Sequence, residues 1–74
     1  MTLADLWDKL AQYETIFTEV IVTKDEWLKL AACVHINCLR DDALGFYLLV
    51  AYPTGPVKIR YALAEAPRTL DLSK

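Results

Sequence analysis

Residues Phe46 to Leu63 read "FYLLVAYPTGPVKIRYAL" and contain the strongest structural pattern of this sequence. Two runs of aliphatic, β-branched and aromatic residues flank Pro53-Thr54-Gly55-Pro56, and this pattern predicts an antiparallel β-hairpin. If the four-residue loop pairs Tyr52 with Val57, alternate side chains point to opposite faces of the hairpin. The face that we expect to enter the core consists of Phe46, Leu48, Val50, Tyr52, Val57, Ile59, Tyr61 and Leu63.

The opposite face of this hairpin mixes apolar, aromatic and basic side chains. The outer face of a sheet in an isolated domain is usually polar, which keeps the domain soluble. Tyrosine and arginine are also enriched at the energetic centres of protein interfaces. We therefore predict a protein-binding surface on this face, formed by Tyr47, Leu49, Lys58 and Arg60.

The N-terminal part predicts a helix followed by a strand. Thr2 and Asp5 have the spacing of a capping box, and the apolar residues that follow recur at helical intervals until about Glu14. Residues 15–23, "TIFTEVIVT", are rich in β-branched side chains and predict a first strand. The expected core residues of the helix are Leu3, Leu6, Trp7, Leu10 and Tyr13.

A second capping box, Thr23 with Glu26, predicts a second helix from Lys24 to Cys38 or Leu39. Cys33 and Ile36 fall near its Lys29 side, where solvent is expected, so we predict that a partner covers this side and add both residues to the protein-binding surface. The expected core face consists of Trp27, Leu30, Ala31, Val34 and Cys38.

These elements follow one another in the order α-β-α-β-β and predict an α+β fold. Two helices would pack on one face of a three-stranded sheet that contains the C-terminal antiparallel hairpin. Seventy-four residues are enough for a single small domain, which we place at residues 1–66. Residues 67–74, "PRTLDLSK", have little to bury, and we expect them to form a mobile tail.

The only histidine and both cysteines lie in residues 30–42, "LAACVHINCLRDD". On a helix, Cys33 and His35 point about 200° apart and Cys33 and Cys38 about 140° apart, so the three side chains cannot converge on one ion. The same geometry argues against a disulfide between the two cysteines. One serine, one histidine and two glycines provide neither a nucleophile triad nor a phosphate loop. We expect no metal, no cofactor and no enzymatic activity.

Composition favours a protein partner or a homo-oligomer. Hydrophobic residues make up 55% of the chain, above the roughly 45–50% of soluble domains. The net charge of −2 and the scattered basic residues argue against nucleic acid, and the glycine-aromatic signature of an RNA-binding sheet is absent. The apolar runs are far shorter than the roughly 20 residues of a membrane span. The acidic N-terminal region lacks the features of a signal peptide, so we expect a cytoplasmic location.

Residues 22–67 resemble the central part of the thirty-kilodalton subunit of respiratory complex I and its equivalent in membrane-bound hydrogenases. The resemblance rests on Leu39-Arg40-Asp41-Asp42, Gly45-Phe46, Leu48-Leu49 and Tyr61-Ala62-Leu63. It implies a β-α-β-β segment in a cofactor-free subunit that packs against neighbouring redox subunits.

Two functional hypotheses follow. The first is a small non-enzymatic protein-interaction module, such as an inhibitor or adaptor of a phage or mobile element, that acts by binding a protein partner. The alternative, which comes from the resemblance, is a cofactor-free accessory subunit of a complex I-like or hydrogenase redox complex.

Overall fold

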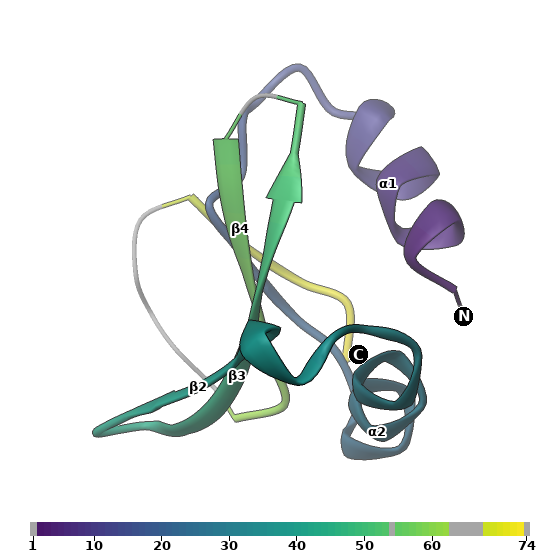
Figure 1. Cartoon of the computed structure of the whole chain (residues 1–74). Coiled ribbons are helices and arrows are strands. Elements are labelled where there is room, and N and C mark those ends of the chain that lie inside the picture. Colours follow the sequence, from purple (N-terminus) through teal and green to yellow (C-terminus); the bar gives the residue numbers. More distant parts are fainter. Residues whose placement is uncertain (1, 54, 63–67, 74) are drawn as a thin grey trace.

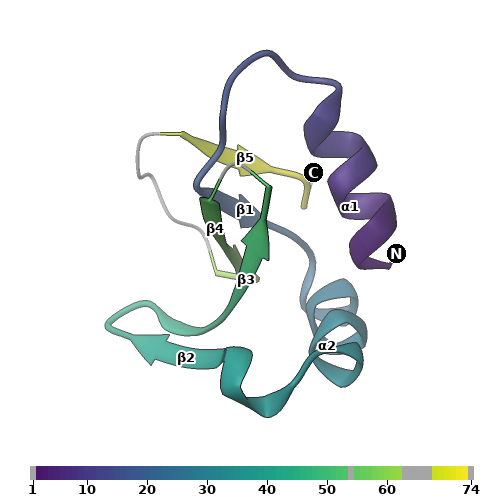
Figure 2. The same cartoon turned by 45° about the horizontal axis from the view of Figure 1, so that its top comes forward.

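The computed structural model describes residues 2–53, 55–62 and 68–73, and Figures 1 and 2 show two views of the chain. The strands form one mixed sheet in the order β2-β3-β4-β1-β5, in which β1 runs parallel to β4 and β5 and the other neighbours are antiparallel. The elements are α1 (Leu3–Ala11), β1 (Glu19–Ile21), α2 (Lys24–Cys33), the short 3-10 helix η1 (Ile36–Cys38), β2 (Leu39–Asp42), β3 (Gly45–Tyr52), β4 (Gly55–Arg60) and β5 (Thr69–Asp71).

The α+β class and the two α-helices agree with the sequence prediction, but the sheet has five strands instead of three. Side chains of α1 and α2 pack together on the same face of this sheet. The two unpredicted strands, β2 and β5, form its two edges. They come from segments that the sequence assigned to a loop and to a tail.

Both helices begin where their capping residues predict. The Thr2 hydroxyl accepts a hydrogen bond from the Asp5 amide at 3.2 Å, and the Asp5 carboxylate accepts one from the Thr2 amide at 3.0 Å. The Thr23 hydroxyl accepts a hydrogen bond from the Glu26 amide at 3.3 Å, and α2 begins at the next residue, Lys24. These bonds satisfy backbone N–H groups that have no partner within the helix.

Helix α2 ends at Cys33, several residues before the predicted end. Val34 has an extended backbone, and His35 Nδ1 accepts a hydrogen bond from the Asn37 amide at 3.1 Å, which starts η1. Such local side-chain bonds compete with helix continuation. The helical angles predicted between Cys33, His35 and Cys38 are therefore wrong. Cys33 is exposed, whereas Cys38 packs against the core.

The connection between α2 and the hairpin contains a strand that the sequence did not predict. Leu39–Asp42 pairs antiparallel with β3, and residues 43 and 44 form the turn between them. The Leu44 amide donates to Asp42 Oδ1 at 2.9 Å, and Gly45 has a φ of +110° that favours glycine. Gly45 therefore closes the β-turn between β2 and β3.

The β3–β4 hairpin forms as predicted, with a register shifted by two residues. Tyr52 pairs with Gly55 and Val50 pairs with Val57. Because side chains alternate with a period of two, this shift leaves every residue on its predicted face. Phe46, predicted to enter the core, is nevertheless 51% exposed, since it lies at the far end of β3 opposite Asp41. Leu63 lies outside the described residues.

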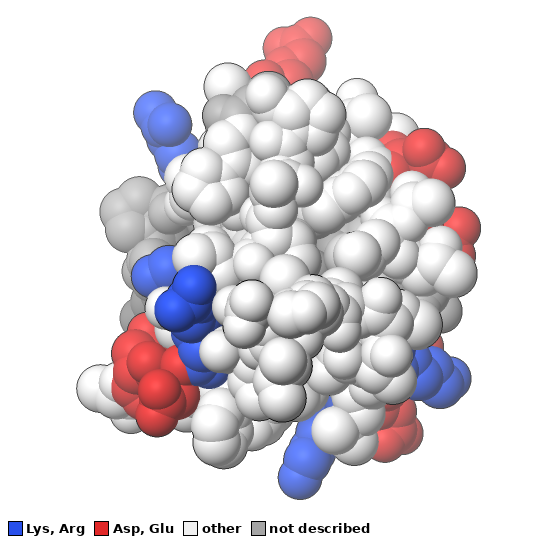
Figure 3. Space-filling view, in the orientation of Figure 1, with Lys and Arg blue, Asp and Glu red and all other residues white. Residues whose placement is uncertain are grey.

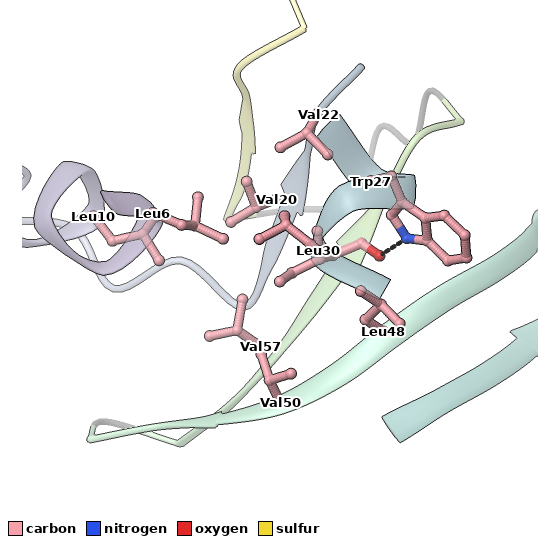
Figure 4. Packing of buried hydrophobic residues seen from close by; sticks show 10 residues of the cluster. Leu6, Leu10, Val20, Val22, Trp27, Leu30, Leu48, Val50 and Val57 are labelled. Carbon is pink, nitrogen blue, oxygen red and sulfur yellow. Dashed lines mark hydrogen bonds between the residues drawn. The ribbon is translucent and has the colours of Figure 1, made fainter. Parts of the chain in front are cut away.

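The core lies between the helices and the sheet (Figure 4). Trp27 anchors α2, because its indole Nε1 donates to the buried carbonyl of Ile59 at 2.8 Å. The buried cluster consists of Leu6, Leu10, Val20, Val22, Trp27, Leu30, Leu48, Val50, Val57 and Ile59.

The C-terminal segment expected to be mobile contains β5, which pairs in parallel with β1. The Leu72 amide donates to the Ile21 carbonyl at 2.7 Å, and both Leu70 and Leu72 pack against the core. The segment therefore has more to bury than its composition indicated. Of the predicted tail, residues 67 and 74 lie outside the described residues, as do residues 63–66 of the predicted domain.

Candidate functional site

Arg60 occupies the centre of an ion cluster on the sheet face opposite the helices. Its Nε donates to Glu19 Oε1 at 2.7 Å. Its two terminal nitrogens bond both oxygens of Asp42, at 3.0 Å and 2.5 Å. Arg60 is only 2% exposed, and its guanidinium joins the buried Glu19 of β1 to Asp42, a partly exposed carboxylate at the end of β2.

The hydrogen bonds of this cluster stabilise the charged forms of both Asp42 and Arg60. The hydrogen bond from Arg60 lowers the pKa of Asp42 below its usual value, and the Leu44 amide acts in the same direction. The bonds to Asp42 and Glu19 raise the pKa of Arg60. Glu19 also accepts a hydrogen bond from the Thr69 hydroxyl at 3.2 Å, through its second oxygen. All the ions therefore have partners within the chain, as buried charges require.

Tyr47, Leu49, Lys58 and Arg60 do share one face, as the sequence indicated. The Arg60 guanidinium carbon lies 4.6 Å from the centroid of the Tyr47 ring, and Lys58 Nζ lies 5.1 Å from it. Tyr47, Leu49 and Lys58 are half-buried. Because the Arg60 guanidinium is buried and its three nitrogens bond carboxylates, Arg60 does not present a free charge to a partner.

A pocket of about 440 Å³ lies beside this face, where Leu49 and Lys58 approach the chain before β1. Its walls are Ile16, Phe17, Thr18, Glu19, Leu49, Gly55, Pro56 and Lys58. Among the described residues, its charged wall residues are Glu19, which already binds Arg60 and Thr69, and Lys58. The remaining wall is mainly apolar.

Three of the exposed apolar side chains, including the most exposed one, lie on the helix side of the sheet, around η1 and the β2–β3 hairpin. Ile36 is 77% exposed, and Leu39 and Phe46 are 40% and 51% exposed. Leu39 pairs with Leu48, two residues along β3 from Phe46, so Leu39 and Phe46 are diagonal neighbours on one face. We call Ile36, Leu39 and Phe46 the hairpin patch.

The hairpin patch borders an apolar pocket of about 230 Å³ between α2 and the sheet. Figure 3 shows that the face carrying η1 has no charged side chains over its middle, while acidic and basic groups lie around its rim. Of the predicted residues, Ile36 lines this pocket, whereas Cys33 is exposed but is not part of its wall. The pocket residues are Trp27, Ala31, Val34, His35, Ile36, Leu39 and Leu48.

Sequence reasoning missed Leu39 and Phe46 because the first was placed in a helix and the second in the core. The lengths of the two observed elements explain why Phe46 is exposed. A strand of eight residues spans about 27 Å, whereas a ten-residue helix spans about 15 Å. The end of β3 therefore extends past the helix that covers it. The partners of Arg60 lie 18 and 41 residues away in sequence, and no local pattern indicates them.

Among residues 2–53, 55–62 and 68–73, no group of three or more His, Cys, Asp or Glu side chains could hold a metal ion. Both cysteines are free thiols. Within the same described part, no helix is long and apolar enough to cross a lipid bilayer.

Searches against protein-family models, curated proteins and solved structures found no match to this chain. Functional inference therefore rests on the surface itself.

Proposed function

We propose that this chain is a small non-enzymatic protein-binding module, of the inhibitor or adaptor kind, that acts by binding a protein partner. The observation that carries the proposal is the hairpin patch. Three large apolar side chains are exposed next to an apolar pocket. One of them, Leu39, belongs to β2, which is an edge strand of the described sheet. Contiguous exposed apolar surface of this kind is typical of interaction sites.

The energetics favour the hairpin patch over the outer sheet face. Ile36 and Phe46 would gain from being covered, because each still exposes half or more of its surface. At about 25 cal/mol per Å² of apolar area, burying such side chains contributes on the order of 1–2 kcal/mol each. On the outer face, by contrast, the cations already stack on Tyr47 within the molecule.

A capture experiment in the native host tests the proposal. The tagged full chain is compared with an Ile36→Asp/Phe46→Asp variant, and captured proteins are identified by mass spectrometry. The matched control is Leu28→Asp, which places the same charge on a residue that is 51% exposed on α2 and does not line the pocket. We expect a specific partner with the wild type and the control, and its loss with the patch variant. Circular dichroism and urea unfolding check that all three proteins fold.

Equal capture by all three folded proteins would contradict a binding role for the hairpin patch. In that case, a Leu49→Asp/Lys58→Glu variant would test the outer face predicted from the sequence.

The second candidate is the accessory subunit of a complex I-like or hydrogenase complex. The order of elements from β1 to β4 supports it in part: a strand and a helix precede an antiparallel hairpin, but the strand β2 stands between the helix and that hairpin. This candidate predicts that the captured partner is an iron–sulfur or hydrogenase subunit, whereas the first predicts a partner without a redox centre. The same mass spectrometry separates the two.

A further inference from the structure

The edge of β2 offers unused backbone hydrogen-bonding groups beside the hairpin patch. Among residues 2–53, 55–62 and 68–73, β2 is the terminal strand of the sheet and pairs with β3 alone, and all four of its residues are exposed. Figure 2 shows β2 along the outer side of the hairpin. Every second N–H and C=O of a strand points away from its neighbour, so this edge can accept another strand.

The charges on β2 disfavour a second copy of this chain as that strand. A two-fold antiparallel pairing of β2 with itself places one residue opposite its own copy. At the middle of the strand, this residue is Arg40 or Asp41. Like charges directly opposite one another destabilise a strand pair. Neither side chain has an ion pair or side-chain hydrogen bond in the described part of the chain. When Asp41 is at the centre, Arg40 lies opposite Asp42 of the other copy, but both oxygens of Asp42 already bond Arg60 of their own chain, which weakens that compensation.

The same charges define a complementary foreign strand. Leu39 and Asp41 point to the helix side, and Arg40 points to the opposite face. In an antiparallel partner, a basic residue would lie opposite Asp41, an acidic residue opposite Arg40 and an apolar residue opposite Leu39. The apolar residue would then lie on the helix side, next to Ile36 and the 230 Å³ pocket.

Resting on the proposed function, we propose that the partner binds through an extended segment that adds to β2 as an antiparallel strand and carries the residue order basic–acidic–apolar. Backbone hydrogen bonds supply the register, the hairpin patch buries the apolar side chain, and the two charge pairs select the sequence.

Two synthetic peptides of identical composition test the inference. Both are ten-residue, fluorescently labelled and threonine-rich, and they differ only in a central Lys-Glu-Ile or Glu-Lys-Ile. Fluorescence anisotropy with the full chain should show the Lys-Glu-Ile peptide binding at least about tenfold more tightly, since two favourable charge pairs become two repulsive ones. The protein variant Arg40→Asp/Asp41→Arg should reverse this preference. Both substituted residues are exposed, and circular dichroism checks the fold.

Equal binding of the two peptides, or a preference that the charge-swapped variant does not reverse, would overturn the inference. So would self-association of the wild type through β2, detected by sedimentation velocity as a dimer lost in that variant. The captured native partner separates this failure from that of the proposed function. If Ile36→Asp/Phe46→Asp abolishes its binding while the charge swap leaves it unchanged, the binding role stands and the strand-addition mode fails. If neither change affects capture, both proposals fail.

Discussion

Arg60 was predicted from the sequence to bind a partner, but in the structure it forms a buried ion cluster. In the sequence it is an arginine on the outward side of a hairpin, which is typical of a binding residue. In the structure its guanidinium holds Glu19 and Asp42, and its side chain is buried. Removing one member of such an ion cluster is destabilising, because the buried charge that remains has neither an ion partner nor water to solvate it.

We expect Arg60→Met to lower the free energy of unfolding by about 3–5 kcal/mol, since Glu19 would remain buried without its cation. Urea unfolding followed by circular dichroism measures the change. Lys58→Met, on the same strand and half-buried, is the matched control and should cost less than about 1 kcal/mol. If Arg60→Met does not fold, Glu19→Leu/Arg60→Met should recover folding. An Arg60→Met protein as stable as the control would contradict the structural role of the cluster.

Asp42 predicts a pH dependence of stability. Its pKa in the folded chain is lowered from the ordinary 3.8, mainly by the hydrogen bond from Arg60. The stabilisation from its charge is therefore present above pH 3.8 and is lost as the pH falls through the lowered value. Unfolding free energies of wild type and Asp42→Asn should differ at pH 6 and converge toward pH 2. Asp5 and Glu26, whose pKa values are also lowered, remain in both proteins and cancel. A difference that stays constant with pH would contradict the assignment.

Among the elements, the C-terminal strand β5 determines whether the outer side of β1 is covered or exposed to solvent. β1 has only three residues, and all of them are buried because β4 lies on one side and β5 on the other. β5 in turn depends on Leu70 and Leu72 reaching the core, since three residues provide few backbone bonds. The C-terminal segment is thus part of the domain.

We expect Leu70→Ala to lower the free energy of unfolding by about 1–2 kcal/mol, less than a fully buried leucine because Leu70 is half-buried. Leu28→Ala, at an exposed position of α2, should change it by less than about 0.5 kcal/mol. Thermal or urea unfolding of both variants compares them directly. If the C-terminal segment were mobile, both substitutions would leave the free energy of unfolding nearly unchanged, and that result would refute a packed β5.

The elements that the sequence predicts well are those with local causes. Thr2 and Thr23 mark helix starts through bonds to residues three positions away, and the β3–β4 hairpin follows from alternation and a turn sequence. β2 and β5 have no such signal. Each is three or four residues long and exists because a neighbouring strand presents a free edge. The hairpin patch was missed for the same reason, because Leu39 becomes a strand residue only through pairing with β3.

In the molecule as a whole, the strand-addition proposal requires that a chain with 55% hydrophobic residues does not pair with itself through β2. Of the two edge strands in the described part of the chain, β5 is half-buried and β2 is exposed, and three of the four residues of β2 are charged. Charged edge strands are a common protection against strand-to-strand association. The same charges that select a foreign strand would therefore keep the free protein monomeric.

Removing these charges should convert the β2 edge into a self-association site. We expect Arg40→Thr/Asp41→Thr to form dimers or larger species at micromolar concentrations where the wild type is monomeric, because threonine favours strands and removes the like-charge repulsion. Sedimentation velocity measures the distribution. The matched control is Asp8→Thr/Lys9→Thr, which removes one acid and one base from the exposed side of α1 and leaves the net charge unchanged in the same way. If both variants stay monomeric, edge charge does not control association, and the apolar residues of the hairpin patch are insufficient to hold two copies together. If the control also associates, the effect belongs to surface polarity in general and not to β2.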